Sequence, residues 1–181
     1  GIRGIKGFIE EKDISNKEKM LIGKNSLLVQ NLVAHIENPI DHIKIVACIS
    51  EDKNYALVDT INQLSFDKKY SPKVFYCLLN SKLIKNYWNT TYSDNKLLFP
   101  KIKGYQLKEL PIKKIPLQEQ TPLIRLAEQM LDAQEQLNRA ISDSDKKFLQ
   151  QRVDILDKQI NTVVYGLYGL AADDVKVVEG E

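Results

Sequence analysis

Three charged residues in the first third of the chain follow the order that a metal-dependent nuclease centre requires. Asp41 precedes the apolar stretch 43–49, and that stretch runs into Glu51 and Lys53. Nucleases of this kind bind Mg²⁺ between two carboxylates and use a lysine to orient the attacking water. Because Glu-Asp-Lys-Asn is also typical of a hairpin turn, both interpretations stay open. Unchanged Mg²⁺-dependent cleavage after Glu51→Gln would rule out the nuclease.

The two histidines and two cysteines are further side chains that could bind a metal ion. His35 and His42 do not follow the spacing of a familiar zinc site, so we interpret them as ordinary surface or turn residues. Cys48 and Cys77 both lie in apolar stretches, which predicts buried free thiols in a reducing compartment. We therefore expect no metal site in this chain.

The motifs of a methyltransferase active site are not found in the sequence. Adenine methyltransferases grip the flipped base with Asn or Asp, two prolines and an aromatic residue. The nearest string, Asn38-Pro39-Ile40-Asp41, lacks the second proline and the aromatic residue. A glycine-rich phosphate loop, a methyl-donor motif, a serine elbow and a Cys–His pair are absent as well. We expect this chain to be non-catalytic by itself and to bind no cofactor.

The positive charge of the chain is concentrated in a basic window, residues 68–114. This window contains 11 lysines against Asp94 and Glu109, a net charge of +9, whereas residues 1–67 and 115–181 are net −2 and −5. Such a window attracts a polyanion, because neutralising phosphates releases counterions; a solvated lysine-rich surface is the alternative. No apolar run approaches the ~20 residues of a membrane span and no signal peptide is found, so we expect a cytoplasmic protein with no membrane partner.

The elements that would position these residues begin with strands. Short segments rich in Val, Ile and Leu predict strands at 26–32, 43–49 and 56–61. A helix is predicted over 71–87, because Ser71 is a good N-cap and Pro72 suits the first helical position. The stretch 89–104 is polar, basic and aromatic without a helical period, which is typical of a long surface loop or a hairpin.

After Pro116 the sequence changes to two long amphipathic helices. The first carries apolar residues four and three apart, interrupted at Gln134: Leu123, Ala127, Met130, Leu137 and Ile141. The second repeats the pattern at Leu149, Val153, Leu156, Ile160, Val163 and Leu167. The polar turn 142–145 between them predicts an antiparallel hairpin, and a short helix over 172–178 follows Gly169. We expect an α+β fold, with a mixed strand-rich domain at 1–116 followed by a long antiparallel helical hairpin at 117–181.

Three strings occur in a fixed order along this framework. They are FYCLLNSKLIKNYW at 75–88, LPIKKIPLQEQ at 110–120 and VYGLYGL at 164–170, the last followed by an acidic helix and Val-Val-Glu. Together with the strand SLLVQ at 26–30, they resemble the C-terminal specificity domain of TaqI-like and type IIG restriction-modification enzymes. Lys113 and Lys114 depart from the proline that is more usual there, and residues 1–25 match nothing that we can assign.

The resemblance implies a DNA target-recognition domain at 1–116 and a hairpin that acts as a spacer. It also implies a longer parent protein with an adenine-N6 methyltransferase domain and often a nuclease, and we interpret the first residues, GIRGIKGF, as an internal part of it. The parent would use S-adenosylmethionine, and Mg²⁺ if it carries a nuclease. The expected partners are double-stranded DNA and the methyltransferase domain. A type I specificity subunit is the nearest alternative, and an interaction protein that oligomerises through the hairpin is another.

The basic window supplies the candidate DNA contacts. Lysines hold phosphates and set the register, whereas Asn, Gln and Lys read base edges in the major groove. The candidates are Lys68, Lys69, Asn89, Tyr92, Asn95, Lys96, Lys101 and Lys103. Lys82 and Lys85 join them if their side of the helix faces DNA. We interpret Tyr87, Trp88 and Phe99 as core residues.

Overall fold

A small antiparallel sheet forms one layer of the fold. The computed structural model describes residues 10–19, 26–31, 35–36, 42–43, 45–49, 57, 60–67, 69–92 and 101–180. In the sheet, β1 (Ser26–Gln30) lies between β4 (Ala47–Ile49) and β5 (Ile61–Ser65), and Leu28 is opposite Cys48 on one side and Gln63 on the other. A second, two-stranded ladder joins β2 (His35–Ile36) to β3 (His42–Ile43). A 3-10 turn (Glu11–Asp13) and α1 (Asn16–Lys19) precede the sheet.

The strand prediction is correct for β1 and displaced for the other two strands. The expected strand 43–49 consists of two pieces, since β3 ends at Ile43 and β4 begins at Ala47. The expected strand 56–61 is wrong in position, because Leu57 and Thr60 lie outside any strand and β5 starts at Ile61. Strand β5 was not recognised in the sequence because it contains Asn62 and Gln63. Their polar side chains interrupt the apolar pattern, and their amide nitrogens donate hydrogen bonds to Ile102 O and Ser26 Oγ, respectively.

The single helix predicted over 71–87 is in fact two helices, α2 (Pro72–Asn80) and α3 (Lys82–Tyr92). Ser71 caps the first helix as expected, since its Oγ accepts a hydrogen bond from Lys73 N–H at 3.3 Å. The break falls at Ser81, whose backbone is extended. Lys82 N–H donates to Asn161 Oδ1 at 2.8 Å instead of to the carbonyl four residues before it. A contact with a distant helix therefore ends α2.

The surface loop predicted at 89–104 is wrong at both ends. Helix α3 continues to Tyr92, a short helix α4 (Gly104–Lys108) begins at Gly104, and residues 93–100 lie outside the described part of the chain. Asn89 Nδ2 and Thr90 Oγ1 each donate to a carbonyl four residues earlier at 2.9 Å. Their polar groups are therefore satisfied inside the helix, and their polar character did not mark its end.

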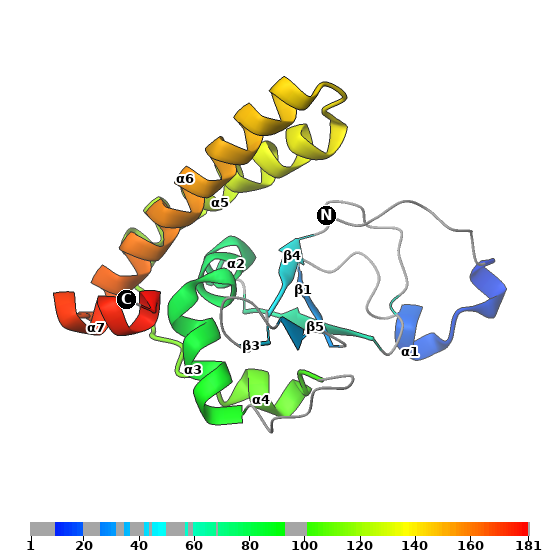
Figure 1. Ribbon diagram of the computed structural model, residues 1–181. Coiled ribbons are helices and arrows are strands. Elements are labelled where there is room, and N and C mark those ends of the chain that lie inside the picture. Colours follow the sequence, from blue (N-terminus) through cyan, green and yellow to red (C-terminus); the bar gives the residue numbers. More distant parts are fainter. Residues whose placement is uncertain are drawn as a thin grey trace.

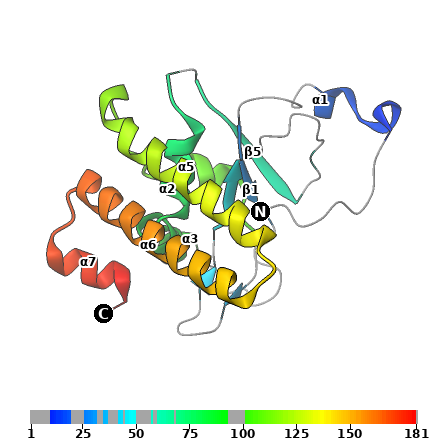
Figure 2. The ribbon, with the colours of Figure 1, turned by 90° about the horizontal axis from the view of Figure 1, so that it is seen from above.

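The two long helices form the predicted antiparallel hairpin. In Figures 1 and 2, α5 (Leu117–Arg139) and α6 (Asp143–Tyr168) lie side by side, and α7 (Ala172–Glu179) follows Gly169, which ends α6 with φ +70°. Ser142 caps α6 by accepting a hydrogen bond from Asp145 N–H at 3.0 Å. The two apolar stripes pack as expected, with Leu123 and Ala127 buried on α5 and Leu156 and Ile160 buried on α6. The prediction is wrong for Ile141, which follows the end of α5 and is 93% exposed.

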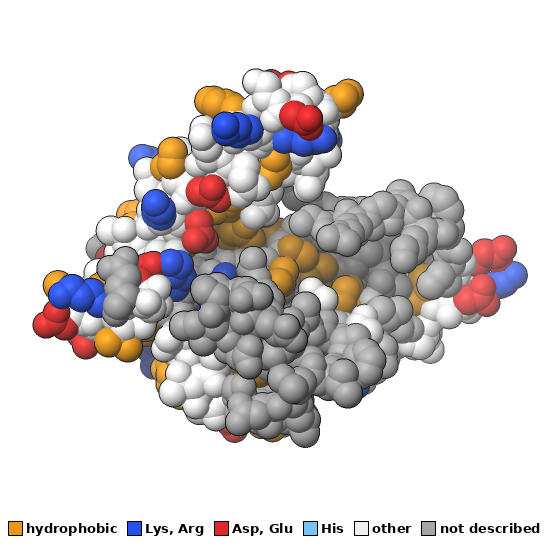
Figure 3. Space-filling view, viewed as in Figure 1, with side chains coloured by type: hydrophobic (Ala, Val, Ile, Leu, Met, Phe, Trp, Pro, Cys, Tyr) orange, Lys and Arg blue, Asp and Glu red, His pale blue; other side chains and the backbone are white. Residues whose placement is uncertain are grey.

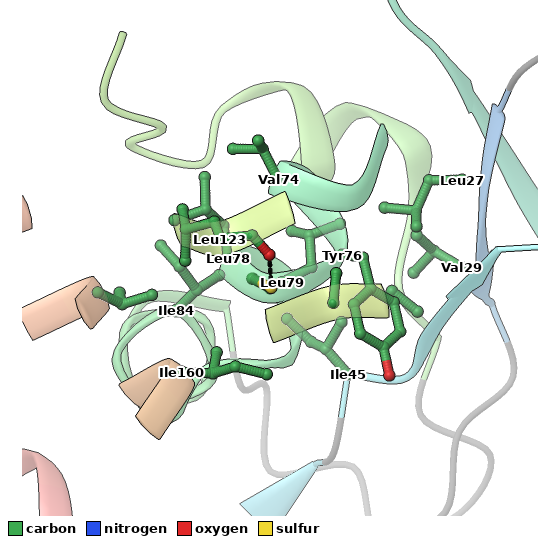
Figure 4. Close-up of a cluster of buried hydrophobic side chains, with 14 of the residues drawn as sticks. Leu27, Val29, Ile45, Val74, Tyr76, Leu78, Leu79, Ile84, Leu123 and Ile160 are labelled. Atoms are coloured by element: carbon green, nitrogen blue, oxygen red, sulfur yellow. Dashed lines mark hydrogen bonds between the residues drawn. The ribbon is translucent and has the colours of Figure 1, made fainter. Parts of the chain in front are cut away.

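Helix α2 lies between the sheet and the hairpin and carries the centre of the core. Figure 4 shows Leu27 and Val29 of β1 on one side of α2, and Leu123 of α5 and Ile160 of α6 on the other. Leu78 of α2 is fully buried among them. This arrangement confirms the expected α+β fold with a helical hairpin; the division of the chain at residue 116 stays a prediction.

The two cysteines are free, as the sequence predicts. Cys77 is fully buried on α2, and its thiol donates a hydrogen bond to Leu123 O at 3.4 Å. Burial raises the pKa of Cys77 to about 12, and it raises the pKa of the partly buried Cys48 as well. Both thiols are therefore protonated at neutral pH, and such thiols are poor nucleophiles.

Candidate nucleic-acid interface

The segment that carries Lys101 and Lys103 is anchored to the sheet by the residue between them. Ile102 is fully buried; its N–H donates to Asn31 O at 2.8 Å, and its carbonyl accepts from Asn62 Nδ2 at 2.8 Å. Successive side chains of an extended segment point in opposite directions, so burying Ile102 exposes both lysines. Two of the predicted DNA contacts therefore lie together at one end of the sheet.

Helix α4 extends this surface. Gln106 and Leu107 are buried, which leaves Tyr105, 54% exposed, and Lys108 on the outer side. Gln106 Oε1 accepts a hydrogen bond from Lys103 N–H at 2.8 Å and so fixes the start of the helix. Lys103 Nζ lies 5.8 Å from the centre of the Tyr105 ring, within range of a cation–π contact. We call Lys101, Lys103, Tyr105 and Lys108 the α4 surface.

The sequence prediction missed Tyr105 and Lys108. They are three residues apart on one side of a helix of five residues, which is too short to produce a clear periodic signal. The one signal in the sequence was the apolar residue Leu107 between them, which is buried in the structure and packs residues 104–108 on the body of the protein.

Tyr92 ends α3 next to this surface. Its hydroxyl donates to Glu109 Oε2 at 3.1 Å, and its ring contacts the rings of Tyr87 and Trp88. Desolvation and the hydrogen bond to Glu109 raise the pKa of Tyr92, so the hydroxyl stays a neutral donor. Tyr92 thus joins the end of α3 to Glu109, which follows α4.

Lys69 is not brought to the α4 surface, and Asn89 lies on α3, one turn before Tyr92. Lys69 follows the carboxyl end of β5, whereas Ile102 packs beside Asn62 near the start of that strand. Lys69 Nζ lies 3.4 Å from Asp67 Oδ2 and 5.4 Å from the centre of the Tyr70 ring. Asn89 is partly buried on α3 and bonds within that helix.

Several predicted site residues fall outside the described part of the chain. They are Lys68, Asn95 and Lys96 of the DNA contacts, Asp41, Glu51 and Lys53 of the nuclease alternative, and Phe99. The side chains of His35 and His42 are not described either. Among the described residues, no group of His, Cys, Asp and Glu side chains could hold a metal ion, and no helix is long and apolar enough to cross a membrane.

Other lysines of the basic window are bound to the hairpin and to α7. Lys73 Nζ lies 2.7 Å from Glu128 Oε1, Lys82 pairs with Glu179, and Lys113 Nζ donates to Leu167 O. Basic and acidic side chains alternate over the hairpin and α7 in Figure 3. By contrast, the three lysines of the α4 surface pair with no carboxylate within the described ranges. Their positive charge is open to a polyanion.

The sequence of the sheet, α2, α3 and α4 matches a known family. Residues 6–112 match the TaqI-like C-terminal specificity domain. The chain belongs to that family. Membership supports a role in DNA sequence specificity within restriction-modification systems, and a specificity domain is not itself catalytic. No curated protein and no solved structure matches the chain significantly.

The matched specificity domain has different limits from those of the three strings. It includes residues 6–25, which the sequence analysis left unassigned, and it stops at residue 112. VYGLYGL and most of LPIKKIPLQEQ therefore lie beyond it. The likeness of these two strings to the family stays a prediction.

The Leu-Leu-Asn-Ser-Lys string of the specificity domain is explained by packing. The side chain of Asn80 donates to Ala47 O at 3.0 Å and accepts from Ala47 N–H at 3.3 Å, which satisfies the backbone of the edge strand β4. Ser81 Oγ donates to Leu78 O at 2.6 Å and accepts from Ile84 N–H at 3.3 Å, so it joins α2 to α3. Asn80 and Ser81 therefore stabilise the fold of the specificity domain.

Glu179 fastens α7 to α3 and α6. It accepts a hydrogen bond from Tyr165 OH at 2.6 Å and pairs with Lys82. Burial opposes the ionisation of Glu179, but the hydrogen bonds from Lys82 and Tyr165 outweigh it and lower the pKa of Glu179. Burial and the hydrogen bond to Glu179 raise the pKa of Tyr165. At neutral pH the contact is therefore a neutral hydroxyl donating to a charged carboxylate.

Tyr168→Phe is expected to loosen the hairpin from the specificity domain. The Tyr168 hydroxyl donates to Pro111 O at 3.0 Å and accepts from Lys113 N–H at 3.1 Å, so it joins α6 to the segment that leads into α5. Removing both bonds should lower the free energy of unfolding by about 1–2 kcal/mol. Urea unfolding measures the loss, and hydrogen exchange should show a less protected Lys113 amide. Tyr105→Phe is the control, because Tyr105 is exposed; equal protection of Lys113 in both variants would contradict the role of Tyr168.

Proposed function

We propose that this specificity domain recognises a DNA sequence on behalf of catalytic domains in the same parent protein. The family match over residues 6–112 is the observation that carries the proposal. The α4 surface supports it, because Lys101, Lys103 and Lys108 are exposed and have no carboxylate partner among the described residues. Uncompensated lysines held on a fixed surface are suited to the phosphates of duplex DNA.

The parent that we propose is an adenine-N6 DNA methyltransferase of the type IIG kind, with or without endonuclease activity. Its catalytic domains would bind S-adenosylmethionine, and Mg²⁺ where a nuclease is present, while this chain contacts duplex DNA and the methyltransferase domain. The resemblance of the strings at 75–88, 110–120 and 164–170 supports this assignment. A parent that modifies chromosomal DNA in a bacterial or archaeal cell would be cytoplasmic.

The helical hairpin also supports a second candidate, a specificity subunit of a type I restriction system. Such a subunit would use the hairpin formed by α5 and α6 as a spacer between recognition domains. The two candidates differ in one measurable property. A type IIG parent methylates DNA as a single chain, whereas a type I subunit needs a separate methyltransferase subunit.

The experiment that tests recognition is selection from a random duplex-DNA library at two salt concentrations. Wild type is compared with the variant Lys96→Ala, Lys101→Ala, Lys103→Ala. We expect salt-sensitive binding that enriches one motif and is weakened in the variant. Salt-sensitive binding without enrichment would mean that base readout needs the parent's other domains. Absence of binding even at low salt would overturn the proposal for the isolated chain.

A further inference from the structure

The exposed side chains of residues 101–108 belong to only two residue types. Apart from Gly104, the outward residues of the α4 surface are three lysines and one tyrosine. The amide of this segment belongs to Gln106, which is buried, and its oxygen is used by Lys103 N–H. No Asn, Gln or Arg side chain therefore projects from the segment. Those are the residues whose planar groups pair with a base edge through two hydrogen bonds in a fixed geometry. A lysine ammonium can also reach guanine, but it is a point charge on a flexible stem and is equally suited to a phosphate, so a surface of lysines alone favours phosphate contacts.

The segment is also held in place before DNA arrives. Ile102 and Leu107 are buried on either side of Lys103, and Ile102 is bonded to Asn31 and Asn62 through its backbone. A surface that is fixed by the core can set the position of the domain on the duplex without ordering itself on binding. Tyr105 adds a hydroxyl beside the lysines, and hydroxyl groups are common phosphate donors.

The carboxylate next to α4 pairs with no lysine among the described residues. Glu109, at the end of the helix, accepts a hydrogen bond from Tyr92. Lys73 and Lys82, by contrast, have carboxylate partners on α5 and α7. The lysines of the basic window thus divide into some that hold the hairpin and α7 and others that project from the α4 surface.

We infer that the α4 surface contacts DNA phosphates and sets the register of the domain without reading bases. The inference rests on the proposed function and extends it to Tyr105 and Lys108. Base readout then belongs to other parts of the specificity domain. Substitutions on the α4 surface should weaken binding to every sequence by a similar factor.

The test compares two variants of the full 181-residue chain that lose the same charge. The first is Lys101→Ala, Lys103→Ala, Lys108→Ala. The control is Lys146→Ala, Lys147→Ala, Lys158→Ala, three exposed lysines on α6. Because all six side chains are exposed, both variants should keep the thermal unfolding midpoint of wild type. The readouts are the affinity for the selected motif and for a scrambled duplex, the salt dependence of both, and the motif enriched from a random library.

We expect the first variant to lose about tenfold or more in affinity for both duplexes at 0.1 M salt. The slope of log affinity against log salt should fall by about 3, roughly one for each lysine, while the enriched motif stays the same. The control variant should stay close to wild type. If wild type enriches a motif and the two variants behave alike, the inference is wrong and the proposed function stands. A changed motif in the first variant would mean that the α4 surface reads bases. If wild type binds no duplex, the proposed function and the inference both fail.

Discussion

Trp88→Ala is expected to lower the free energy of unfolding by about 3–5 kcal/mol, the range for truncating a large aromatic residue in a packed core. Trp88 lies on α3 and is 1% exposed, and its ring centre is 6.2 Å from that of Tyr92. The loss is large against the roughly 5–15 kcal/mol that hold a typical domain folded. Urea unfolding measures this loss. It is followed by circular dichroism, because Trp88 is the one tryptophan of the chain and its replacement removes the tryptophan fluorescence signal.

Trp88→Phe is the matched control for this prediction. It keeps an aromatic ring and removes the indole N–H, which is buried without a hydrogen-bond acceptor in the part of the chain that the structure describes. We expect a smaller loss of stability, about 1–2 kcal/mol, and unchanged DNA affinity of the folded protein. If Trp88→Ala kept its stability and lost DNA binding, Trp88 would be a base-stacking residue, and its assignment to the core would be wrong.

Gln120→Leu is expected to cost about 2–4 kcal/mol although leucine has a similar volume. Gln120 is 2% exposed; its Oε1 accepts from Ser71 N–H at 3.4 Å, and its Nε2 donates to Ile115 O at 3.0 Å and more weakly to Lys69 O at 3.5 Å. Leucine leaves the backbone groups of Ser71 and Ile115 without a partner, and each buried polar group left unsatisfied costs about 1–3 kcal/mol. Urea unfolding gives the free energy.

The control for Gln120 lies two residues away on the same helix. Gln118 is exposed, so Gln118→Leu should change stability by less than about 0.5 kcal/mol. Hydrogen exchange at Ser71 and Lys73 adds a local readout, because Ser71 N–H donates to Gln120 and Lys73 lies in the first turn of α2. Equal stability of the two variants would show that Gln120 is not the polar link between α2 and α5.

Local signals in the sequence account for the parts of the fold that were predicted correctly. Ser71 with Pro72 marks the start of α2, Ser142 marks the start of α6, and Gly169 ends it in the left-handed conformation. Caps and turns depend on the residues within a few positions, and a long apolar stripe depends on one helix at a time. The sequence alone therefore determined the helical hairpin, and the string at 75–88 lies inside the part of the chain that matches the family.

Part of the candidate surface is also readable from local signals, although its contact with DNA stays a prediction. The charge of the basic window is readable in the sequence, and two of its candidates, Lys101 and Lys103, are exposed in the structure. Tyr105 and Lys108 were missed, because five residues do not establish a helical period. Lys69 lies apart from that surface, because the charge of a window carries no information about where its residues lie in space; its contact with DNA stays a prediction.

Contacts between residues far apart in the sequence decided the rest. The break at Ser81 combines the local cap by Ser81 Oγ with Asn161, which binds Lys82 N–H from 79 positions away. Asn62 is accommodated in β5 because Ile102 accepts its hydrogen bond from 40 positions away. Glu128 and Glu179 likewise determine which lysines are neutralised and leave the α4 surface positive. The charges and the apolar stripes can be read from the sequence. Which of them face one another is decided when distant elements pack, because hydrogen bonds and ion pairs act only over a few ångströms.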